Sequence, residues 1–297
     1  MKPLLQLHLL VFLVATTAIV GRLSTVSAAN LVTWRTGTAA IAAFLWVALV
    51  RRHRIPTSRI PTLLGIGGII GLHWLCFFGA IQLANISICL AGMATISLFT
   101  AFTEPLFERR RVRPFEVLLG LVVVAGILLI AGLERAHWAG LGVGLLGALF
   151  AAIFPVLNRQ LVTRGGDPLG MVAWEMVGAC LTCLLLFPLF DPRGHAALLD
   201  LTAIDWAGVM WLSLVCTVFG HAFHIHLLRD IKAYPANLAM NVEPVWGILF
   251  GALFFAEYAE LHPGFYLGVT AIIAANLAHP WLERKARHPQ LPAPKGS

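Results

Sequence analysis

A carboxylate and a proline stand side by side within an apolar stretch, at Glu243 and Pro244. An ionisable group in the middle of an apolar, membrane-length helix costs about 2.5 to 3.5 kcal/mol, so it is expected to face a cavity or a partner. Proline removes the hydrogen bond to the carbonyl of Met240 and disfavours helical geometry at the preceding residue. The pair therefore predicts a kink, with Pro244 as a hinge and Glu243 as a site for a cation, an amine or a proton. Trp246 is expected on the same face, and the alternative role for Glu243 is a packing contact with a neighbouring helix.

Glu175 and Arg35 are two further charged residues inside apolar stretches. Glu175 is a candidate for proton coupling, because burial raises the pKa of a carboxyl group and a nearby cation lowers it. Arg35 can hold a carboxylate or a phosphate through two parallel hydrogen bonds. A purely structural pairing of Arg35 with an acidic residue is the alternative, and Glu175 is a possible partner for it.

Histidine and aromatic side chains supply the remaining candidates for a binding site. His221 and His224 are three residues apart, so they share one helical face. The pair can line a cavity or relay protons, but the sequence offers no second pair of ligands nearby, and we predict no metal site. His73, Trp74 and Phe77 are expected to form an aromatic wall of the same cavity, although such runs also occur in ordinary helix packing.

Composition determines what kind of element must position these residues. Of the 297 residues, 59% are hydrophobic and 12% are charged, which excludes a water-soluble globular chain. The net charge of +7 comes from short basic runs between apolar stretches, so we attribute it to membrane topology rather than to nucleic-acid binding. The expected surroundings are a lipid bilayer.

Hydropathy predicts an all-α integral membrane protein with ten transmembrane helices, since about 20 apolar residues cross the hydrocarbon core. The predicted spans are residues 4–24, 30–50, 61–82, 86–107, 114–133, 138–158, 168–190, 206–228, 234–257 and 263–283.

Basic residues alternate between the predicted loops and so indicate the orientation. One side carries runs such as Arg51, Arg52 and Arg54, and Arg109 to Arg113, whereas the other side is mostly acidic. By the positive-inside rule, both termini are predicted to be cytoplasmic.

The two halves of the chain are weakly similar to each other. Residues 84–87 align with residues 233–236, and the same shift places Glu108 on Glu257. Five spans in each half is an odd number, so the second half is predicted to be inverted in the membrane. We expect a first five-helix repeat over residues 1–135, a second, inverted repeat over 136–285, a central cavity between them and a disordered cytoplasmic tail over 286–297.

These features resemble the EamA family of the drug/metabolite transporter superfamily. The resemblance covers residues 5 to 283 and rests on Arg35, on Glu108 with Gly120, and on the stretch Asn237 to Gly268 that contains Pro244 and Glu257. It implies a multi-pass protein of the bacterial inner membrane that moves small metabolites, often outward. In the first half, Thr95 stands where the second half has Pro244, so proline-dependent mechanics are not expected there.

The sequence thus favours a secondary active transporter that works by alternating access and takes its energy from proton coupling or exchange. A pocket offering Arg35 and acidic groups suits a zwitterion, so the expected small-molecule substrate is an amino acid or a related polar metabolite. The family resemblance implies export as the expected direction. No nucleotide-binding motif is present, so the energy is not expected to come from a nucleotide. We expect neither a cofactor nor enzymatic activity. The alternatives are an exporter of hydrophobic cations, a polytopic membrane enzyme that uses His221 and His224, and a passive channel or scaffold. The oligomeric state is left open.

Overall fold

A computed structural model describes residues 3–50, 55–131, 138–255 and 263–287, and these residues form helices and short connections without any strand. In the first half the helices are α1 (Pro3–Val14), α2 (Thr16–Leu23), α3 (Ala28–Val50), α4 (Ile60–Leu83), α5 (Ile86–Met93), α6 (Ile96–Glu108) and α7 (Pro114–Ala131). In the second half they are α8 (Trp138–Thr163), α9 (Pro168–Phe190), α10 (Ala203–Met210), the π-helix η4 (Trp211–His221), α11 (Ala222–Leu227), α12 (Ala233–Met240), α13 (Glu243–Phe255) and α14 (Pro263–Arg287). Two short 3₁₀ turns, η1 (Thr57–Arg59) and η3 (Gly194–Leu199), lie in connections.

Six segments of the described chain are long and apolar enough to cross a membrane, which confirms the all-helical, multi-pass class. They are Pro3–Leu23, Ala28–Leu49, Thr57–Leu83, Trp138–Thr163, Pro168–Phe190 and Ala203–Leu227. The finer prediction of ten spans in two inverted repeats stays a prediction. Helix α14 continues to Arg287, and residues 288–297 of the predicted tail lie outside the described residues.

Two helices of the bundle are interrupted in the same manner. The helix formed by α5 and α6 breaks at Ala94 and Thr95, and the helix formed by α12 and α13 breaks at Asn241 and Val242. In both cases an eight-residue helix is followed by one of thirteen residues. The second break directly precedes Glu243, as expected for a kink beside a proline.

The break between α5 and α6 was not expected from the sequence, because it contains no proline. There the side chain of Thr95 replaces part of the helical hydrogen bonding, since its Oγ1 donates to the carbonyl of Gly92 at 2.7 Å. Side-chain hydrogen bonds of this local kind compete with the regular helix. Two amides then join the interrupted helices: Asn241 Nδ2 donates to Ser97 Oγ, and Asn237 Nδ2 donates to Thr100 Oγ1, each at 2.8 Å.

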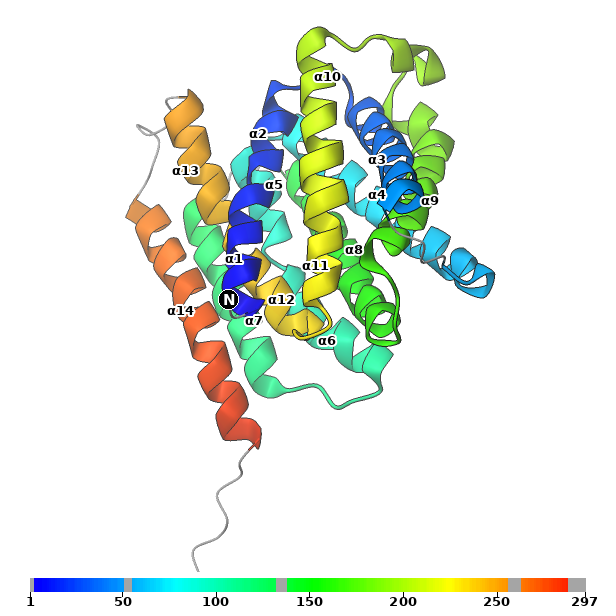
Figure 1. The fold of residues 1–297 in the computed structure, drawn as a ribbon. Coiled ribbons are helices and arrows are strands. Elements are labelled where there is room, and N and C mark those ends of the chain that lie inside the picture. Colours follow the sequence, from blue (N-terminus) through cyan, green and yellow to red (C-terminus); the bar gives the residue numbers. More distant parts are fainter. Residues whose placement is uncertain (1–2, 51–54, 132–137, 256–262, 288–297) are drawn as a thin grey trace, which may run out of the picture.

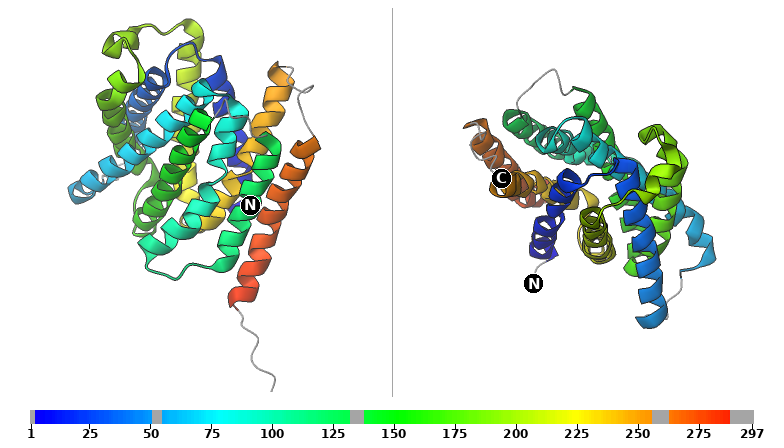
Figure 2. Two further views of the ribbon diagram at one scale, coloured as in Figure 1. Left: turned by 180° about the vertical axis from the view of Figure 1, so that it is seen from behind. Right: turned by 90° about the horizontal axis from the view of Figure 1, so that it is seen from above.

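Close helix crossings hold α4 against α9 on one side of the bundle, where α3 also packs (Figure 1). A Cβ atom on Gly67 would lie 1.9 Å from the carbonyl oxygen of Glu175, and one on Gly178 would lie 2.1 Å from that of Leu64. These glycines let the two backbones approach, as small residues do in membrane helix pairs. On the opposite side α7 packs against α14 (Figure 2).

A cluster of ion pairs closes the end of the bundle where α6, α7, α8 and α14 meet. The Arg110 guanidinium bridges Glu104 and Glu116 at 2.7 and 2.9 Å, and Arg159 binds Glu108 at 2.8 Å. Glu104 is fully buried, so its pairing with Arg110 compensates a charge removed from water.

Candidate functional site

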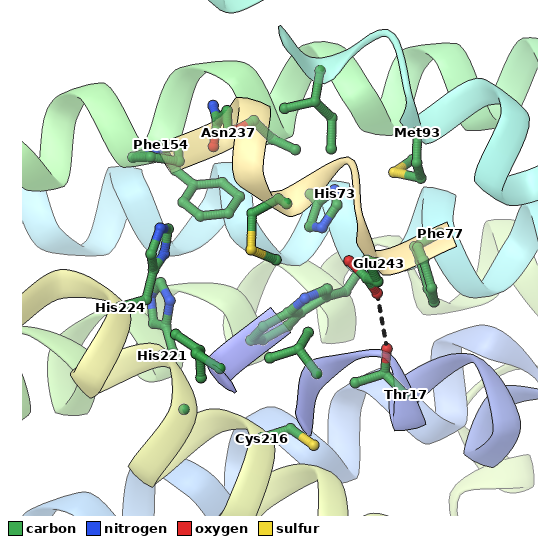
Figure 3. Close-up of a pocket in the computed structure, with 18 of the residues that line it drawn as sticks. Thr17, His73, Phe77, Met93, Phe154, Cys216, His221, His224, Asn237 and Glu243 are labelled. Carbon is green, nitrogen blue, oxygen red and sulfur yellow. Dashed lines mark hydrogen bonds between the residues drawn. The ribbon is translucent and has the colours of Figure 1, made fainter. Parts of the chain in front are cut away.

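A cavity of about 110 Å³ lies at the centre of the bundle, between the first and second halves of the chain (Figure 3). It is walled by residues from ten different helices and from η4. Its lining residues are Leu10, Val14, Thr17, Arg35, His73, Trp74, Phe77, Met93, Ile96, Ala151, Phe154, Pro155, Cys216, Gly220, His221, His224, Asn237, Met240 and Glu243.

Arg35 supplies the permanent positive charge of this cavity. It is 3% exposed; its Nε donates to Thr217 Oγ1 at 3.0 Å, and its guanidinium carbon lies 3.7 Å above the ring of Trp74. These contacts fix the plane of the guanidinium while, within the described chain, neither Nη atom makes a hydrogen bond. Two adjacent N–H-bearing nitrogens held in a plane match the geometry of a carboxylate.

The hydroxyl of Thr217, which accepts the hydrogen bond from Arg35, is oriented by the π-helical geometry of η4. Thr217 Oγ1 donates to the carbonyl of Leu212, five residues earlier, and therefore has a lone pair for Arg35. Ser213 similarly donates to the carbonyl of Arg35 at 3.0 Å. π-helical turns are uncommon and frequent at functional sites, and here the turn anchors the charged residue of the cavity.

Glu243 supplies the negative charge, at the first residue of α13. Its Oε1 accepts a hydrogen bond of 3.5 Å from Thr17 Oγ1 of α2, as Figure 3 shows. No ion pair links Glu243 to a cation among the described residues, so the carboxylate can interact with a ligand in the cavity. The helix start also favours a negative group through the orientation of the backbone dipoles.

Both helix breaks face the cavity. Met93 and Ile96 flank the break between α5 and α6, and Met240 and Glu243 flank the break between α12 and α13; all four line the cavity. Interrupted helices in membrane proteins are tolerated where their irregular backbone lines a cavity. The two breaks thus bring a pair of thioethers and a carboxylate to the same space.

His221 connects the cavity to a second buried carboxylate. Its Nε2 lies 2.9 Å from Glu175 Oε2, and the side chains are 7% and 0% exposed. The other carboxylate oxygen, Glu175 Oε1, has no hydrogen-bond partner in the part of the chain that is described. Nε2 of the neighbouring His224 is buried and likewise has no partner there.

Aromatic rings form the rest of the wall. The rings of His73 and Phe154 are 5.6 Å apart, and that of Phe154 lies 5.8 Å from His221. His73 Nδ1 is within 3.0 Å of the carbonyl of Gly147, which orients its ring. Phe77 contacts His73 on the other side.

The structure therefore brings together Arg35, His73, Trp74, Phe77, His221, His224 and Glu243 from the predicted set. Glu175 lies behind His221 rather than on the cavity wall. Trp246 is directed instead against Phe12 and Phe250, with ring centroids 4.9 and 6.3 Å away. The main chain at Pro244 continues the first turn of α13. Within the described residues, no group of three or more metal-ligating side chains gathers.

Several lining residues were not singled out in the sequence. Thr17 and Cys216 are residue types common in apolar helices, and no spacing distinguishes them. Met240 stands three residues before Glu243, so helical periodicity alone places it on the same face. Asn237 was detectable in principle, because an amide within an apolar span needs a partner; the structure gives it Thr100.

Comparison with known proteins agrees with this architecture. The model of the EamA-like transporter family matches residues 1–132 and 138–278, and each region contains one of the interrupted helices. An uncharacterized transporter of Archaeoglobus fulgidus is 23% identical over 213 residues, which are 71% of this chain and 75% of that protein. A protein of known crystal structure superposes with a TM-score of 0.73 at 17% identity, over 95% of this chain and 99% of that one, and this likeness concerns the fold alone.

Proposed function

We propose, from the premise that this chain belongs to the EamA-like transporter family, that it is a secondary transporter of a small zwitterionic metabolite such as an amino acid. One observation carries the proposal: a single small cavity holds the guanidinium of Arg35 and the carboxylate of Glu243, and no ion pair joins the two among the described residues. A ligand with a carboxylate and an ammonium group complements both charges.

The proposed architecture is ten spans in two inverted repeats that move against each other around this cavity. The equal lengths of the two interrupted helices support an internal repeat. In transporters built from inverted repeats, broken helices lie at the repeat interface and bind the substrate there. Alternating access would expose the cavity first to one side of the membrane and then to the other, with export as the expected direction and both termini cytoplasmic.

The proposed binding mode assigns each part of the ligand to a different wall. The substrate carboxylate binds the two Nη groups of Arg35, and the ammonium group binds Glu243 with Thr17 beside it. The remaining space is bounded by Phe77, Phe154 and other apolar side chains, which suits a short apolar substrate side chain.

Proton coupling is assigned first to Glu243. A carboxylate that contacts both the substrate and, in turn, each opening can exchange a proton for the ligand. Glu175 is the second candidate and would act through His221, with which it shares a hydrogen bond.

Export of hydrophobic cations is the second candidate function, favoured by the carboxylate and the aromatic walls. Two observations oppose it. The cavity volume of about 110 Å³ is well below the roughly 300–1,000 Å³ typical of pockets for drug-sized ligands, and the buried charge of Arg35 would repel a cation.

A panel of three matched ligands tests the proposal: an amino acid, its decarboxylated amine and its deaminated acid. Ligand binding to purified wild-type protein should raise the unfolding temperature most for the amino acid. Arg35→Gln should abolish the advantage of the amino acid over the amine, and Glu243→Gln should abolish its advantage over the acid. Asp200→Asn, an exposed loop substitution, serves as the control. Stabilisation by cationic dyes but by no zwitterion of the panel would instead favour the second candidate.

A further inference from the structure

A second hollow, separate from the central cavity, runs along the outside of the bundle between α3, the start of α9, and the helix formed by η4 and α11. Its volume is about 580 Å³, and its lining is mostly apolar: Ala42, Trp46, Pro168, Leu169, Leu214, Val218, Phe219, Ala222, Phe223, His226 and Arg229. We call it the outer groove. It shares no lining residue with the central cavity, because η4 and α11 present one face to each.

The length of the outer groove matches one leaflet of a bilayer. From Leu214 to His226 the helix rises at most roughly 18 Å, the value for 1.5 Å per residue in an α-helix, because the π-helical residues of η4 rise less. Half of the hydrocarbon core is about 15 Å thick. The rings of Phe219, Phe223 and His226 are stacked along it, with centroids 5.8 and 6.3 Å apart and nearly parallel planes. Trp46 and Phe219 remain 55% and 57% exposed, so no part of the described chain covers the groove.

One end of the outer groove is polar and basic. His226 and Arg229 lie where α11 ends, and Trp46 lies near the end of α3. Arg229 Nη2 donates to the carbonyl of Gly166 at 3.0 Å, and Arg59 Nη2 donates to the carbonyl of Arg164 at 3.1 Å. Several guanidinium groups therefore surround the connection between α8 and α9, whereas Leu214 and Val218, at the other end of the groove, are apolar.

We propose that the outer groove is a binding site for one glycerophospholipid, with an acyl chain along the aromatic strip and the phosphate at Arg229. An apolar slot one leaflet deep with a basic end complements an amphipathic anion, and basic residues at this level attract anionic headgroups. The indole ring of Trp46 lies at the basic end of the groove, and tryptophan rings favour the interface between hydrocarbon and headgroups. The bound lipid braces the helix whose other face carries His221 and His224, so the site is positioned to influence transport.

The test uses purified full-length protein in a neutral detergent. Phosphatidylglycerol is added in steps and compared with a diacylglycerol of the same chain length and with glycerol phosphate. Native mass spectrometry counts the retained lipids, and the unfolding temperature reports binding. We expect one retained phosphatidylglycerol and a saturable rise in unfolding temperature, with much weaker effects from the other two compounds.

Two substitutions locate the site. Arg229→Ala should weaken the apparent affinity for phosphatidylglycerol about tenfold or more, since a charge-assisted hydrogen bond is lost, and Arg229→Lys should retain part of it. Ala42→Trp, which fills the slot, should remove the retained lipid even though Arg229 is present. Arg284→Ala is the matched control, because Arg284 is an exposed arginine on α14, which does not line the groove.

Three results would overturn the assignment: equal affinity losses in Arg229→Ala and Arg284→Ala, a full effect from glycerol phosphate alone, or equal effects of phosphatidylglycerol and the diacylglycerol. Should Ala42→Trp fail to fold, the comparison of Arg229→Ala with Arg229→Lys still decides. The inference does not depend on the identity of the transported substrate. Binding of the zwitterion panel to the central cavity is measured separately, so either proposal can fail alone.

Discussion

Replacing Arg35 by glutamine separates a role in ligand binding from a role in folding. In the folded protein the hydrogen bond from the charged guanidinium to Thr217 is worth about 1.5 kcal/mol, and the stacking on Trp74 contributes up to about 2 kcal/mol when it is desolvated. Against these stands the cost of about 2.5 to 3.5 kcal/mol for an arginine in the middle of a membrane span. The contributions nearly cancel, so Arg35→Gln should change the free energy of unfolding by no more than about 1 kcal/mol, a shift of roughly 2–4 °C in unfolding temperature.

Ligand binding should respond far more strongly to the same substitution. Each charge-assisted hydrogen bond from an Nη group to a substrate carboxylate contributes about 1.5–3 kcal/mol, so losing even one weakens affinity roughly tenfold to more than a hundredfold.

The assay pairs thermal unfolding without ligand with equilibrium binding of a labelled amino acid to the same preparation. Arg22→Gln, at an exposed arginine near the end of α2, is the matched control and should change neither quantity. A fall in unfolding temperature well beyond 4 °C with unchanged affinity would show that Arg35 holds the helices together and does not bind the ligand.

Further predictions concern coupling and packing. Glu243→Gln should abolish the pH dependence of transport in proteoliposomes while substrate counterflow persists; unchanged pH dependence would remove Glu243 from the coupling step. Glu175→Ala leaves the buried ring of His221 without its partner and should lower the free energy of unfolding by about 1–3 kcal/mol, measured by denaturation. Glu175→Gln keeps a hydrogen-bond acceptor for His221, so its free energy of unfolding should fall by less. Gly67→Ala should destabilise the protein, because a Cβ atom there would lie 1.9 Å from a backbone oxygen of α9. Gly65→Ala, where no atom lies within 4 Å of the added Cβ, should be neutral or slightly stabilising. Equal effects of the two substitutions on stability would refute the close helix crossing.

Helix positions were largely predictable, because a membrane span as a whole must be apolar enough to lie in lipid, and such runs are visible in the sequence. The predicted segment 168–190 coincides with α9 at Pro168–Phe190, and the segment 61–82 lies within α4 at Ile60–Leu83. In each of them a run of some twenty apolar residues must satisfy its backbone within itself, so helix is the available structure.

Interruptions of the helices were less predictable than their ends. The break before Glu243 has a proline as its signal, but the break at Thr95 depends on one hydroxyl hydrogen bond to Gly92. Threonine makes such bonds in regular helices as well, so its presence does not distinguish the two outcomes. The π-helical register of η4, which places Thr217 beside Arg35, depends in turn on packing against α3.

The charged members of the candidate site were predictable because burial of a charge in lipid is costly; Arg35 and Glu243 had to face a cavity or a partner. Trp246 shows the limit of that reasoning. Its assignment to the cavity rested on helical periodicity counted from Glu243, but residues three apart in a helix still point about 60° away from each other. The ring of Trp246 packs against Phe12 and Phe250 instead. The partnership of Glu175 with His221 joins residues 46 positions apart and required the tertiary structure.

Counterflow of a labelled amino acid into proteoliposomes tests the central claim most directly. The wild-type protein should accumulate the label transiently and saturably when the vesicles are loaded with unlabelled amino acid, and Arg35→Gln should reduce this uptake at least tenfold at substrate concentrations below saturation. Failure of every zwitterion to exchange through the wild-type protein, or undiminished exchange through Arg35→Gln, would contradict the account of the cavity given above.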